Sequence, residues 1–532
     1  MANLGFQSVY KIFNDLDGCV AERAFLPGAE EAAEYEKSST PLLSYESQTP
    51  VAAFDVVAFS IPFENDYAGV PRVLELAGLT AMAAARPGDA PLVIAGGVAV
   101  SLNPEPLAEL VDAFLIGEAE GAVAPLVERI RGCAGAGRDE LLGALDGLGF
   151  VYVPSFYEFG YDGAAVSEIT PHRGAKERVR AARSYNLDRF ALPESVITTP
   201  DTEFRDTFLV EIERGCGRGC RFCAAGFLYM PPRWREAGRV RESVTRGAAR
   251  SGKVGLVGAA VSEYPEIKGI VEHAVELGAE VTLSSLRLDA LTPELLALLR
   301  RAGYRTVTIA PEAGTERLRG VVNKGFSDGE ILEAARAVTE AGFRKVKLYF
   351  LIGLPTETDT DAEAIGALAL GVREAAGGGE VALSINPFVP KPFTPFQWHG
   401  FERTEVIERR FSIIKKTLAG RKGFSVSPVS VRGAYAQAYI ARADRRAGAV
   451  IMDASKRGFA KALASARALV EPSVHRVIPA GEALAWDLID HGLKKDYLWR
   501  EYRRGLAGRT TPPCDVGRCT RCGVCGPEFF KS

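Results

Sequence analysis

Long apolar runs are missing from this chain of 532 residues, in which no stretch of eighteen consecutive apolar residues occurs. The amino end also lacks a basic segment followed by an apolar one and a small-residue cleavage site. A long apolar run is typical of membrane-inserted chains, and an amino-terminal signal of this kind is typical of exported ones. Their absence predicts a cytoplasmic protein with no membrane span.

The composition excludes two further classes of protein. Hydrophobic residues make up 47% of the chain and charged residues 25%, which is average for folded globular domains. We therefore expect neither a disordered chain nor a small scaffold held together by disulfides. At roughly 150 residues per domain, the length predicts three or four domains.

Histidine is scarce, because the five histidines stand singly and none precedes His172. They show no metal-binding spacing, and we assign them no role. Cysteine is more informative, since seven of the nine cysteines fall into two groups, at residues 216–223 and 514–525. Grouped cysteines in a chain without a secretory signal predict metal or iron–sulfur ligation. Cys19 and Cys133 stand alone, and we interpret them as ordinary small apolar residues.

Charge is distributed unevenly along the chain. Residues 401–532 contain 25 Lys and Arg against 13 Asp and Glu, a net charge of +12, whereas residues 1–400 carry −15 and the whole chain −3. A basic carboxyl-terminal region fits a polyanionic partner such as RNA. It equally fits a basic domain that docks on an acidic one, so both interpretations stay open.

The first part of the chain predicts an open α/β domain. Residues 51–121 alternate short apolar runs with amphipathic stretches in a β-α-β-α-β rhythm. Strands of this kind predict a parallel sheet with ligand-binding loops at its carboxyl edge, and we expect a Rossmann-like domain over residues 1–150. A helix is predicted over residues 5–16 with no strand before it. We therefore hypothesise that Met1 is an internal methionine of a longer natural chain, whose first strand is absent here.

Apolar strands and helical segments alternate again between residues 207 and 400. Six β/α units of this length predict a partial or full parallel β/α barrel, with its chemistry at the carboxyl ends of the strands. The predicted division of the rest of the chain is a linker over 151–205, the barrel over 206–400, a basic helical region over 401–510 and a Cys-rich tail over 511–532.

Three cysteines directly follow the first strand of the predicted barrel. Cys216, Cys220 and Cys223 lie in the sequence RGCGRGCRFC with the spacing Cys-x3-Cys-x2-Cys. Three thiolates on one glycine-rich loop can hold three irons of a [4Fe–4S] cluster and leave the fourth iron open to a substrate or cofactor. A zinc site short of one ligand and three incidental cysteines are the alternatives, which the position after a strand disfavours.

This segment resembles the motif of the radical S-adenosylmethionine (SAM) superfamily, including an aromatic residue before the third cysteine, here Phe222. The resemblance implies a radical SAM enzyme in which Cys216, Cys220 and Cys223 are the catalytic cluster ligands. In that family the amino and carboxylate groups of SAM chelate the unique iron. One electron then cleaves SAM to methionine and a 5′-deoxyadenosyl radical, which abstracts a substrate hydrogen. An electron donor of the flavodoxin or ferredoxin type is the implied partner.

The ends of the later strands extend this resemblance. Family members bind the SAM amino group at a Gly-Gly-Glu-like turn after the second strand, and here residues 257–260 read Val-Gly-Ala-Ala, which keeps one glycine and loses the acid. We expect Arg287 to contact the SAM carboxylate and Glu312 to accept ribose hydroxyls. The plainer alternative for Arg287 is a surface arginine. For Gly353 it is a glycine that only forms a turn. The SAM-binding residues implied by the resemblance are Phe222, Gly258, Ala259, Ser285, Arg287, Glu312, Ile352 and Gly353.

Residues 51–121 resemble the amino-terminal domain with which many radical SAM enzymes bind cobalamin. Gly96 and Gly97, after the strand PLVIA, would let the backbone approach the corrin or its nucleotide tail. Turn glycines and a docking domain without cofactor are the alternatives. The domain contains no histidine that could serve as lower cobalt ligand. As a whole, the chain most resembles the cobalamin-domain-containing radical SAM family.

The tail carries a second group of cysteines, with the spacing Cys-x4-Cys-x2-Cys-x2-Cys. Paired zinc knuckles usually need a longer span between their two arms, whereas Cys-x2-Cys-x2-Cys occurs in ferredoxin loops. An auxiliary [4Fe–4S] cluster and a structural zinc both stay open. The predicted ligands are Cys514, Cys519, Cys522 and Cys525.

The sequence thus favours a radical SAM enzyme, with cobalamin-dependent methylation of an unactivated carbon as its reaction. A methylthiotransferase-like enzyme that modifies RNA or protein is the alternative. The non-enzymatic alternative is an iron–sulfur electron carrier or RNA-binding protein that never cleaves SAM. The basic pairs within residues 401–510 are either solvated helix faces or an RNA-facing patch. The substrate itself is not predicted.

Overall fold

The computed structural model describes residues 3–428, 430–516 and 518–525, and the chain divides into two compact units. The barrel unit comprises the chain up to Gln7, residues 185–434 and the chain from Leu493 onward. The amino-terminal unit comprises residues 8–184 and 435–492. The sequence predicts one helical region over 401–510, but the structure divides that region between the two units.

The barrel unit is built on two parallel sheets, with the strand orders β12-β11-β8 and β13-β14-β15-β16. All six strands that the sequence predicts between residues 207 and 400 are present, and β16 is added to them. No ladder joins β12 to β13 within the described residues, so the barrel is a partial one. The strands are β8 (Phe208–Glu211), β11 (Lys253–Val257), β12 (Glu280–Leu283), β13 (Thr306–Glu312), β14 (Lys345–Ile352), β15 (Glu380–Pro387) and β16 (Phe424–Pro428).

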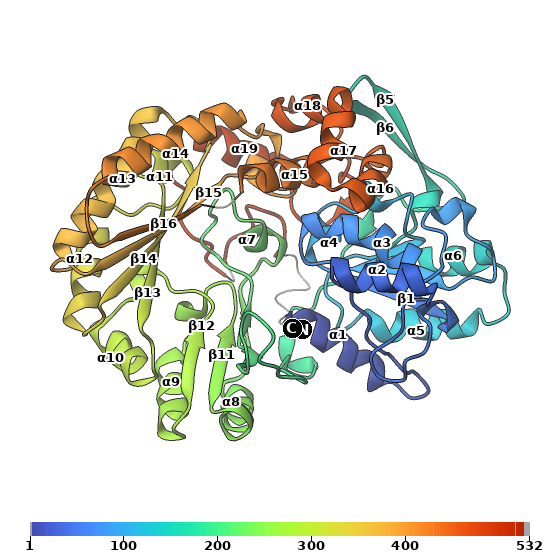
Figure 1. The fold of residues 1–532 in the computed structure, drawn as a ribbon, viewed down its shortest axis with the longest axis horizontal. Coiled ribbons are helices and arrows are strands. Elements are labelled where there is room, and N and C mark those ends of the chain that lie inside the picture. The colour runs from blue at the N-terminus through green and yellow to red at the C-terminus, as the bar shows by residue number, and fades with distance from the viewer. Residues whose placement is uncertain (1–2, 429, 517, 526–532) are drawn as a thin grey trace. The chain divides into compact units, whose positions relative to one another are not determined.

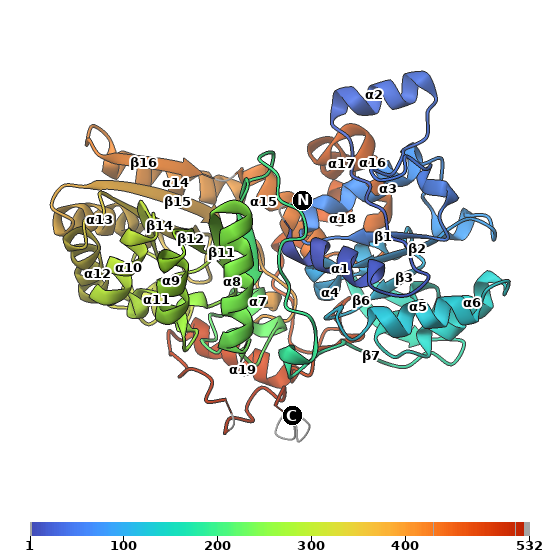
Figure 2. The same ribbon diagram turned by 90° about the horizontal axis from the view of Figure 1, so that it is seen from below.

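Side-chain alternation shows how these strands are covered. In β14 the buried positions are Val346, Leu348, Phe350 and Ile352, while the residues between them are partly exposed. Because buried residues recur at every second position, one face of the sheet is packed against a layer of helices. Figures 1 and 2 show α12 and α13 beside β13–β16. The helices of this layer are α8 (Ala237–Ser251), α9 (Ile267–Glu276), α10 (Pro293–Arg301), α11 (Glu316–Val321), α12 (Asp328–Glu340), α13 (Asp359–Ala375) and α14 (Thr404–Leu418).

Local sequence signals fix where the covering helices begin. α12 starts with a capping box between Ser327 and Glu330, and α13 with one between Thr358 and Asp361. Each box satisfies backbone N–H groups that a helix start leaves open. The barrel unit also contains α15 (Val431–Arg442), which continues into the other unit, and α19 (Lys495–Leu506), from which the tail continues (Figure 2).

The amino-terminal unit has a four-stranded sheet in the order β1-β2-β3-β4. β1 (Val56–Ser60), β2 (Leu92–Gly96) and β3 (Ala113–Leu115) run parallel, and β4 (Val151–Tyr152) is antiparallel to β3. The expected β-α-β order is therefore present. The helix predicted over 5–16 is α1 (Leu4–Asn14), whose residues up to Gln7 belong to the barrel unit. The other helices are α2 (Ala29–Ser38), α3 (Gly69–Leu76), α4 (Val98–Leu102), α5 (Val123–Gly132), α6 (Arg138–Asp146), α16 (Ala447–Arg457), α17 (Phe459–Ser465) and α18 (Arg467–His475).

Residues 151–205, for which the sequence predicts a linker, instead contain regular strands. β5 (Tyr157–Asp162) and β6 (Ala165–Pro171) form a hairpin, and β7 (Val179–Arg180) pairs with β17 (Ile489–Asp490). The stretch reads as polar because its strands alternate: Tyr157 and Phe159 are buried while Glu158 is exposed. The linker prediction is corrected accordingly.

The arginines of the basic helical region are partly used inside the fold. Arg445 Nε lies 2.8 Å from the wholly buried carboxylate of Glu105, and Arg446 pairs with Asp444 at 2.8 Å. These two arginines therefore do not belong to a solvated RNA-facing patch. No helix in the part of the chain that the structure describes is long and apolar enough to span a membrane.

Candidate active site

The thiol loop, residues 215–223, lies between two short strands that hold its ends. β9 (Glu213–Arg214) precedes it and pairs with β10 (Arg233–Trp234), which follows it. Gly215 has φ +92°, and a Cβ there would lie 2.2 Å from the carbonyl oxygen of Tyr229, so only glycine fits. Cys223 caps α7 (Ala224–Leu228), where its Sγ accepts a hydrogen bond from Gly226 N at 3.4 Å. The fold thus fixes the backbone of the loop.

The three thiols of this loop lie near one another. Burial raises the pKa of Cys216 to about 11 and that of Cys223 to about 12, and the neighbouring Cys220 adds to both shifts. All three are partly exposed free thiols. The described residues hold no group of three or more His, Cys, Asp or Glu side chains already arranged to bind a metal ion. Three soft thiols on one loop nevertheless fit the donor set of an iron–sulfur cluster, and their ligand role stays a prediction.

Lys324, which the sequence does not single out, brings positive charge to the thiols. Its Nζ lies 3.2 Å from Glu312 Oε1, and the thiol of Cys220 helps to raise its pKa, although burial opposes the shift. Glu312 ends β13 with φ +68°, a backbone conformation that non-glycine residues rarely adopt. The carboxylate predicted to contact ribose thus has Lys324 as its partner. No local motif marks Lys324, because it reaches the thiols only through the fold.

Four charged side chains meet beside Cys216. Arg287 Nε lies 2.7 Å from Glu263 Oε1 and 3.0 Å from Asp289 Oδ1. Arg218, within the thiol loop, lies 2.6 Å from the same oxygen of Glu263. Arg287 therefore binds carboxylates of its own chain, and its role toward SAM stays a prediction. Its positive charge lowers the pKa of Cys216, although burial of that thiol outweighs the effect.

The turn after β11 receives a carboxylate from another strand. Glu213 Oε1 accepts a hydrogen bond from Ala260 N at 2.5 Å, and a Cβ on Gly258 would lie 2.3 Å from that oxygen. Burial raises the pKa of Glu213 to about 7. The acid that the sequence of this turn lacks is thus supplied by β9. The signal available in the sequence is Glu213 itself, an acidic residue that directly follows the apolar Ile212 at the end of the first predicted barrel strand.

The serines after β12 hold the same turn in place. Ser284 Oγ donates to Gly258 O at 2.8 Å, and Ser285 Oγ accepts from Val261 N at 3.0 Å. Ser285 therefore acts on the turn, while Ala259 is exposed. Phe222 is partly exposed next to Cys223. No contact of either residue with SAM is tested.

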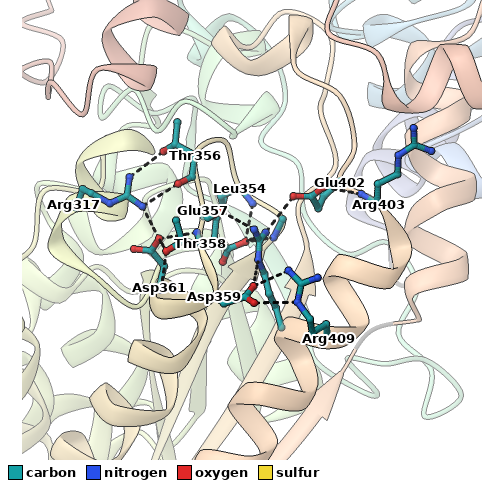
Figure 3. A network of polar contacts seen from close by, with 12 residues as sticks. Arg317, Leu354, Thr356, Glu357, Thr358, Asp359, Asp361, Glu402, Arg403 and Arg409 are labelled. Carbon is teal, nitrogen blue, oxygen red and sulfur yellow. Dashed lines mark hydrogen bonds and ion pairs between the residues drawn. The ribbon is translucent and has the colours of Figure 1, made fainter.

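The loop after β14 is stiffened by the polar network of Figure 3. The carboxylate of Glu357, whose side chain is wholly buried, accepts from Gly353 N and Leu354 N and pairs with Arg410 at 2.9 Å. Ile352 O accepts from Phe388 N at 2.8 Å. The backbone groups predicted to face adenine are therefore partly engaged by the chain itself.

The glycines predicted to approach cobalamin lie in the amino-terminal unit, after β2. Gly97 has φ +114°, and a Cβ there would lie 2.6 Å from Ile61 O. A Cβ on Gly96 would lie 3.7 Å from Leu115 O and 3.9 Å from Leu115 Cβ, which are ordinary contacts. Contact with the chain's own backbone thus already requires glycine at position 97. Cobalamin contact is not needed to explain that residue.

Comparison with known proteins places this site in a class. The family described as "Radical SAM proteins, N-terminal" matches residues 5–154, and the family described as "Radical SAM superfamily" matches residues 210–369. The second match contains the thiol loop and the strands that follow it as far as β14. The chain therefore carries radical SAM superfamily domains, and it is a radical SAM enzyme. Neither description names cobalamin.

The individual proteins that this chain resembles share low sequence identity with it. The chain is 28% identical over 418 residues to an uncharacterized protein of Methanocaldococcus jannaschii, covering 78% of this chain and 84% of that protein. It is 27% identical over 249 residues to a probable dual-specificity RNA methyltransferase of Kineococcus radiotolerans, covering 43% of this chain and 61% of that protein. Among solved structures, the cobalamin-dependent SAM radical enzyme OxsB is similar with a TM-score of 0.45 and 14% identity, covering 69% of this chain. This chain spans 49% of the length of OxsB.

Proposed function

We propose that this chain reductively cleaves SAM at a [4Fe–4S] cluster held by Cys216, Cys220 and Cys223, and that the 5′-deoxyadenosyl radical abstracts hydrogen from a substrate. The observation that carries the proposal is the fixed thiol loop at the carboxyl end of the first strand of a parallel partial barrel. When bound, the cluster supplies the electron that breaks the sulfonium bond. Chemistry at this end of the strands is the rule for such folds.

The surrounding side chains have defined tasks in this proposal. Glu213, at 2.5 Å from Ala260 N, holds the β11 turn, whose backbone is assigned to the SAM amino group. Arg287 and Lys324 place positive charge beside the thiols, where the SAM carboxylate would bind. Glu312 and the backbone at Gly353 are assigned to the ribose and adenine. Lys324 is the addition to the set that the sequence predicts.

Formation of 5′-deoxyadenosine tests the proposal. The protein is reconstituted anaerobically with iron and sulfide, given SAM and titanium(III) citrate, and analysed by mass spectrometry. Wild type and Cys133→Ala, which removes a cysteine outside both groups, are expected to form the nucleoside. Cys220→Ala is expected to form none, because one cluster ligand is missing. A correctly reconstituted wild type that forms no nucleoside contradicts the proposal.

Cobalamin-dependent methylation of an unactivated carbon is the narrower form of the proposal. It is supported by the parallel sheet of the amino-terminal unit and by its predicted ligand edge at Gly96. The test is the cobalt content of the full chain after incubation with hydroxocobalamin and gel filtration. Cobalt at about one atom per chain supports methylation, in line with one ligand per site of this kind. Protein free of cobalt excludes it.

RNA is the substrate class that one comparison favours, because a relative is a probable RNA methyltransferase. Lys415, Lys416, Arg421 and Lys422 are exposed at and just after the end of α14, where they offer a basic patch. The test is binding of transfer and ribosomal RNA at increasing salt. Steep salt dependence that Lys415→Glu/Lys416→Glu reduces supports RNA, and its absence leaves protein or small-molecule substrates. The non-enzymatic alternative has no support, because the superfamily consists of enzymes.

A further inference from the structure

The Cys-rich tail packs directly on the thiol loop within the barrel unit. Cys514 N donates a hydrogen bond to Gly217 O at 2.7 Å. A Cβ on Gly217 would lie 3.2 Å from Cys514 Cβ. Gly217 follows Cys216 in the chain, so one hydrogen bond and one residue connect a predicted ligand of the first site with a predicted ligand of the second.

Asn323 forms hydrogen bonds to both the thiol loop and the tail. Its Nδ2 donates to Arg218 O at 3.2 Å and to Gly219 O at 3.1 Å, both in the thiol loop. Its Oδ1 accepts from Thr511 N at 2.8 Å, at the start of the tail. Asn323 itself has φ +60°, a strained conformation that the surrounding contacts maintain. The thiol loop and the tail are therefore anchored to one residue.

Arg221, which lies within the cysteine motif, also connects the thiol loop to the tail. It lies between Cys220 and Phe222 with a wholly buried side chain. Its guanidinium donates to Arg509 O at 2.7 Å and to Thr511 Oγ1 at 3.1 Å, and it pairs with Glu501 of α19 at 3.1 Å. A buried guanidinium is costly unless its donors are satisfied. These contacts fix the tail against the thiol loop.

The four tail thiols gather at this junction. Cys514, Cys519 and Cys522 line a small cavity together with Gly217 and Gly219 of the thiol loop. Burial raises the pKa of Cys514 to about 12, and the thiols of Cys519, Cys525 and Cys522 add to the shift. The sulfur atoms are thus neighbours, although within the described residues they do not already surround an ion position. Four soft thiols with this spacing fit an iron–sulfur cluster.

We propose that Cys514, Cys519, Cys522 and Cys525 hold a second [4Fe–4S] cluster that passes an electron to the cluster of the thiol loop, by way of the Cys514 N–H to Gly217 O hydrogen bond. The inference rests on the proposed function. One electron moves, so the second cluster is oxidised from [4Fe–4S]⁺ to [4Fe–4S]²⁺ while the first is reduced from [4Fe–4S]²⁺ to [4Fe–4S]⁺. No covalent bond or proton changes place. A reduced flavodoxin or ferredoxin supplies the electron to the second cluster.

The test compares the full-length wild type with Cys519→Ser/Cys522→Ser after anaerobic reconstitution. Cys19→Ser/Cys133→Ser is the matched control, since it removes two cysteines outside both groups. Iron, sulfide and zinc are measured, and 5′-deoxyadenosine formation is timed with reduced flavodoxin and, separately, with titanium(III) citrate. Two clusters require about eight irons per chain in the wild type and control, and about four in the tail variant.

The two reductants separate electron entry from SAM cleavage. With flavodoxin, the tail variant is expected to be slower than wild type by about tenfold or more, because its electron route is interrupted. With titanium(III) citrate, a small reductant that can reach the first cluster directly, the two proteins are expected to agree within about twofold. Equal flavodoxin-driven rates, or wild type with about four irons and one zinc, overturn the inference. A wild type inactive with both reductants overturns the proposed function instead.

A second variant keeps the inference testable if the tail variant does not fold. Arg521→Ala retains every cysteine and removes the hydrogen bonds of this tail guanidinium to Cys519 Sγ at 3.1 Å and to Pro512 O and Pro513 O at 3.3 Å, which loosens the tail beside the loop. Full iron content with a slower flavodoxin-driven rate and an unchanged titanium-driven rate is expected. Full iron content with both rates unchanged contradicts the proposed route.

Discussion

Gly258 and Glu213 show how single residues shape the site. The turn after β11 lacks an acid of its own, and the structure supplies one from β9, close enough that no side chain fits on Gly258. Spacing alone predicts Cys216, Cys220 and Cys223 as cluster ligands, because this pattern is local in the sequence. Glu213 and Lys324 could not be assigned in that way, since each reaches the site from a different strand or helix end.

Gly258→Ala tests the role of this turn. The new methyl group would lie 2.3 Å from Glu213 Oε1, so the carboxylate must move and lose its bond to Ala260 N. A lost hydrogen bond to a buried charged group costs about 1.5–3 kcal/mol, so the SAM concentration for half-maximal 5′-deoxyadenosine formation should rise about tenfold or more. Iron content should not change.

The matched control for this variant is Gly329→Ala, in α12 of the same unit. The nearest atom to its added methyl group is Ser327 Oγ at 3.8 Å, so SAM dependence should equal that of wild type. If Gly258→Ala retains its iron and shows the wild-type SAM dependence, the turn does not bind SAM.

Among the elements, the loop after β14 carries the polar network that Figure 3 displays. Alternating apolar residues predict β14 correctly, and the turn glycine at 353 is visible in the sequence. The ion pair between Glu357 and Arg410, separated by 53 positions in the chain, is not, because nothing local indicates which arginine reaches the loop. Sequence patterns therefore predict the strand but not what stiffens the loop that follows it.

Glu357→Gln should reveal a pH dependence of stability. Burial raises the pKa of Glu357 from 4.5 to about 7, while Arg410 opposes the shift. The folded state therefore holds this proton more tightly than the unfolded chain. The stabilising contribution is full below pH 4.5 and is lost as the pH rises through 7. Wild type should lose up to about 3 kcal/mol relative to Glu357→Gln between pH 5 and pH 8.

Thermal unfolding at both pH values measures this difference. Glu330→Gln is the control, because the capping-box contacts with Ser327 lower the pKa of that exposed carboxyl, and its contribution has the opposite sign. A wild-type Tm that falls no more than that of Glu357→Gln between pH 5 and pH 8 contradicts the assignment.

At the scale of the whole molecule, each unit combines segments that are far apart in the chain. The α/β class and the alternation of strands and helices along the chain follow from the sequence, because parallel β/α units repeat locally. The division into units does not follow: Arg445 and Glu105 are 340 residues apart, and periodicity cannot pair them. The sequence places Arg445 in a basic region, whereas the structure makes it part of the core of the amino-terminal unit.

Arg445→Ala should destabilise the amino-terminal unit. Its loss leaves the carboxylate of Glu105, whose side chain is 0% exposed, without its ionic partner, and removes a guanidinium packed 4.2 Å from the ring centre of Phe159. Breaking a buried ion pair in this way costs about 3–5 kcal/mol. Hydrogen exchange by mass spectrometry should show faster exchange at residues 103–107 and 151–159.

Arg457→Ala is the control for this variant, because the pair with Asp453 lies on the surface of α16. Surface pairs of this spacing contribute about 0.3–0.5 kcal/mol, and exchange at both segments should stay at the wild-type rate. Equal exchange in the two variants would show that Glu105 does not depend on Arg445.

The central claim is that the thiol loop holds a cluster with an iron open to SAM. It is tested most directly by electron paramagnetic resonance of the reduced Cys519→Ser/Cys522→Ser protein, in which the thiol loop is the remaining predicted cluster site. The account predicts a [4Fe–4S]⁺ signal that changes its g-values when SAM is added, and no such signal after the further change Cys220→Ala. A signal that SAM leaves unchanged, or one that survives Cys220→Ala, would contradict it.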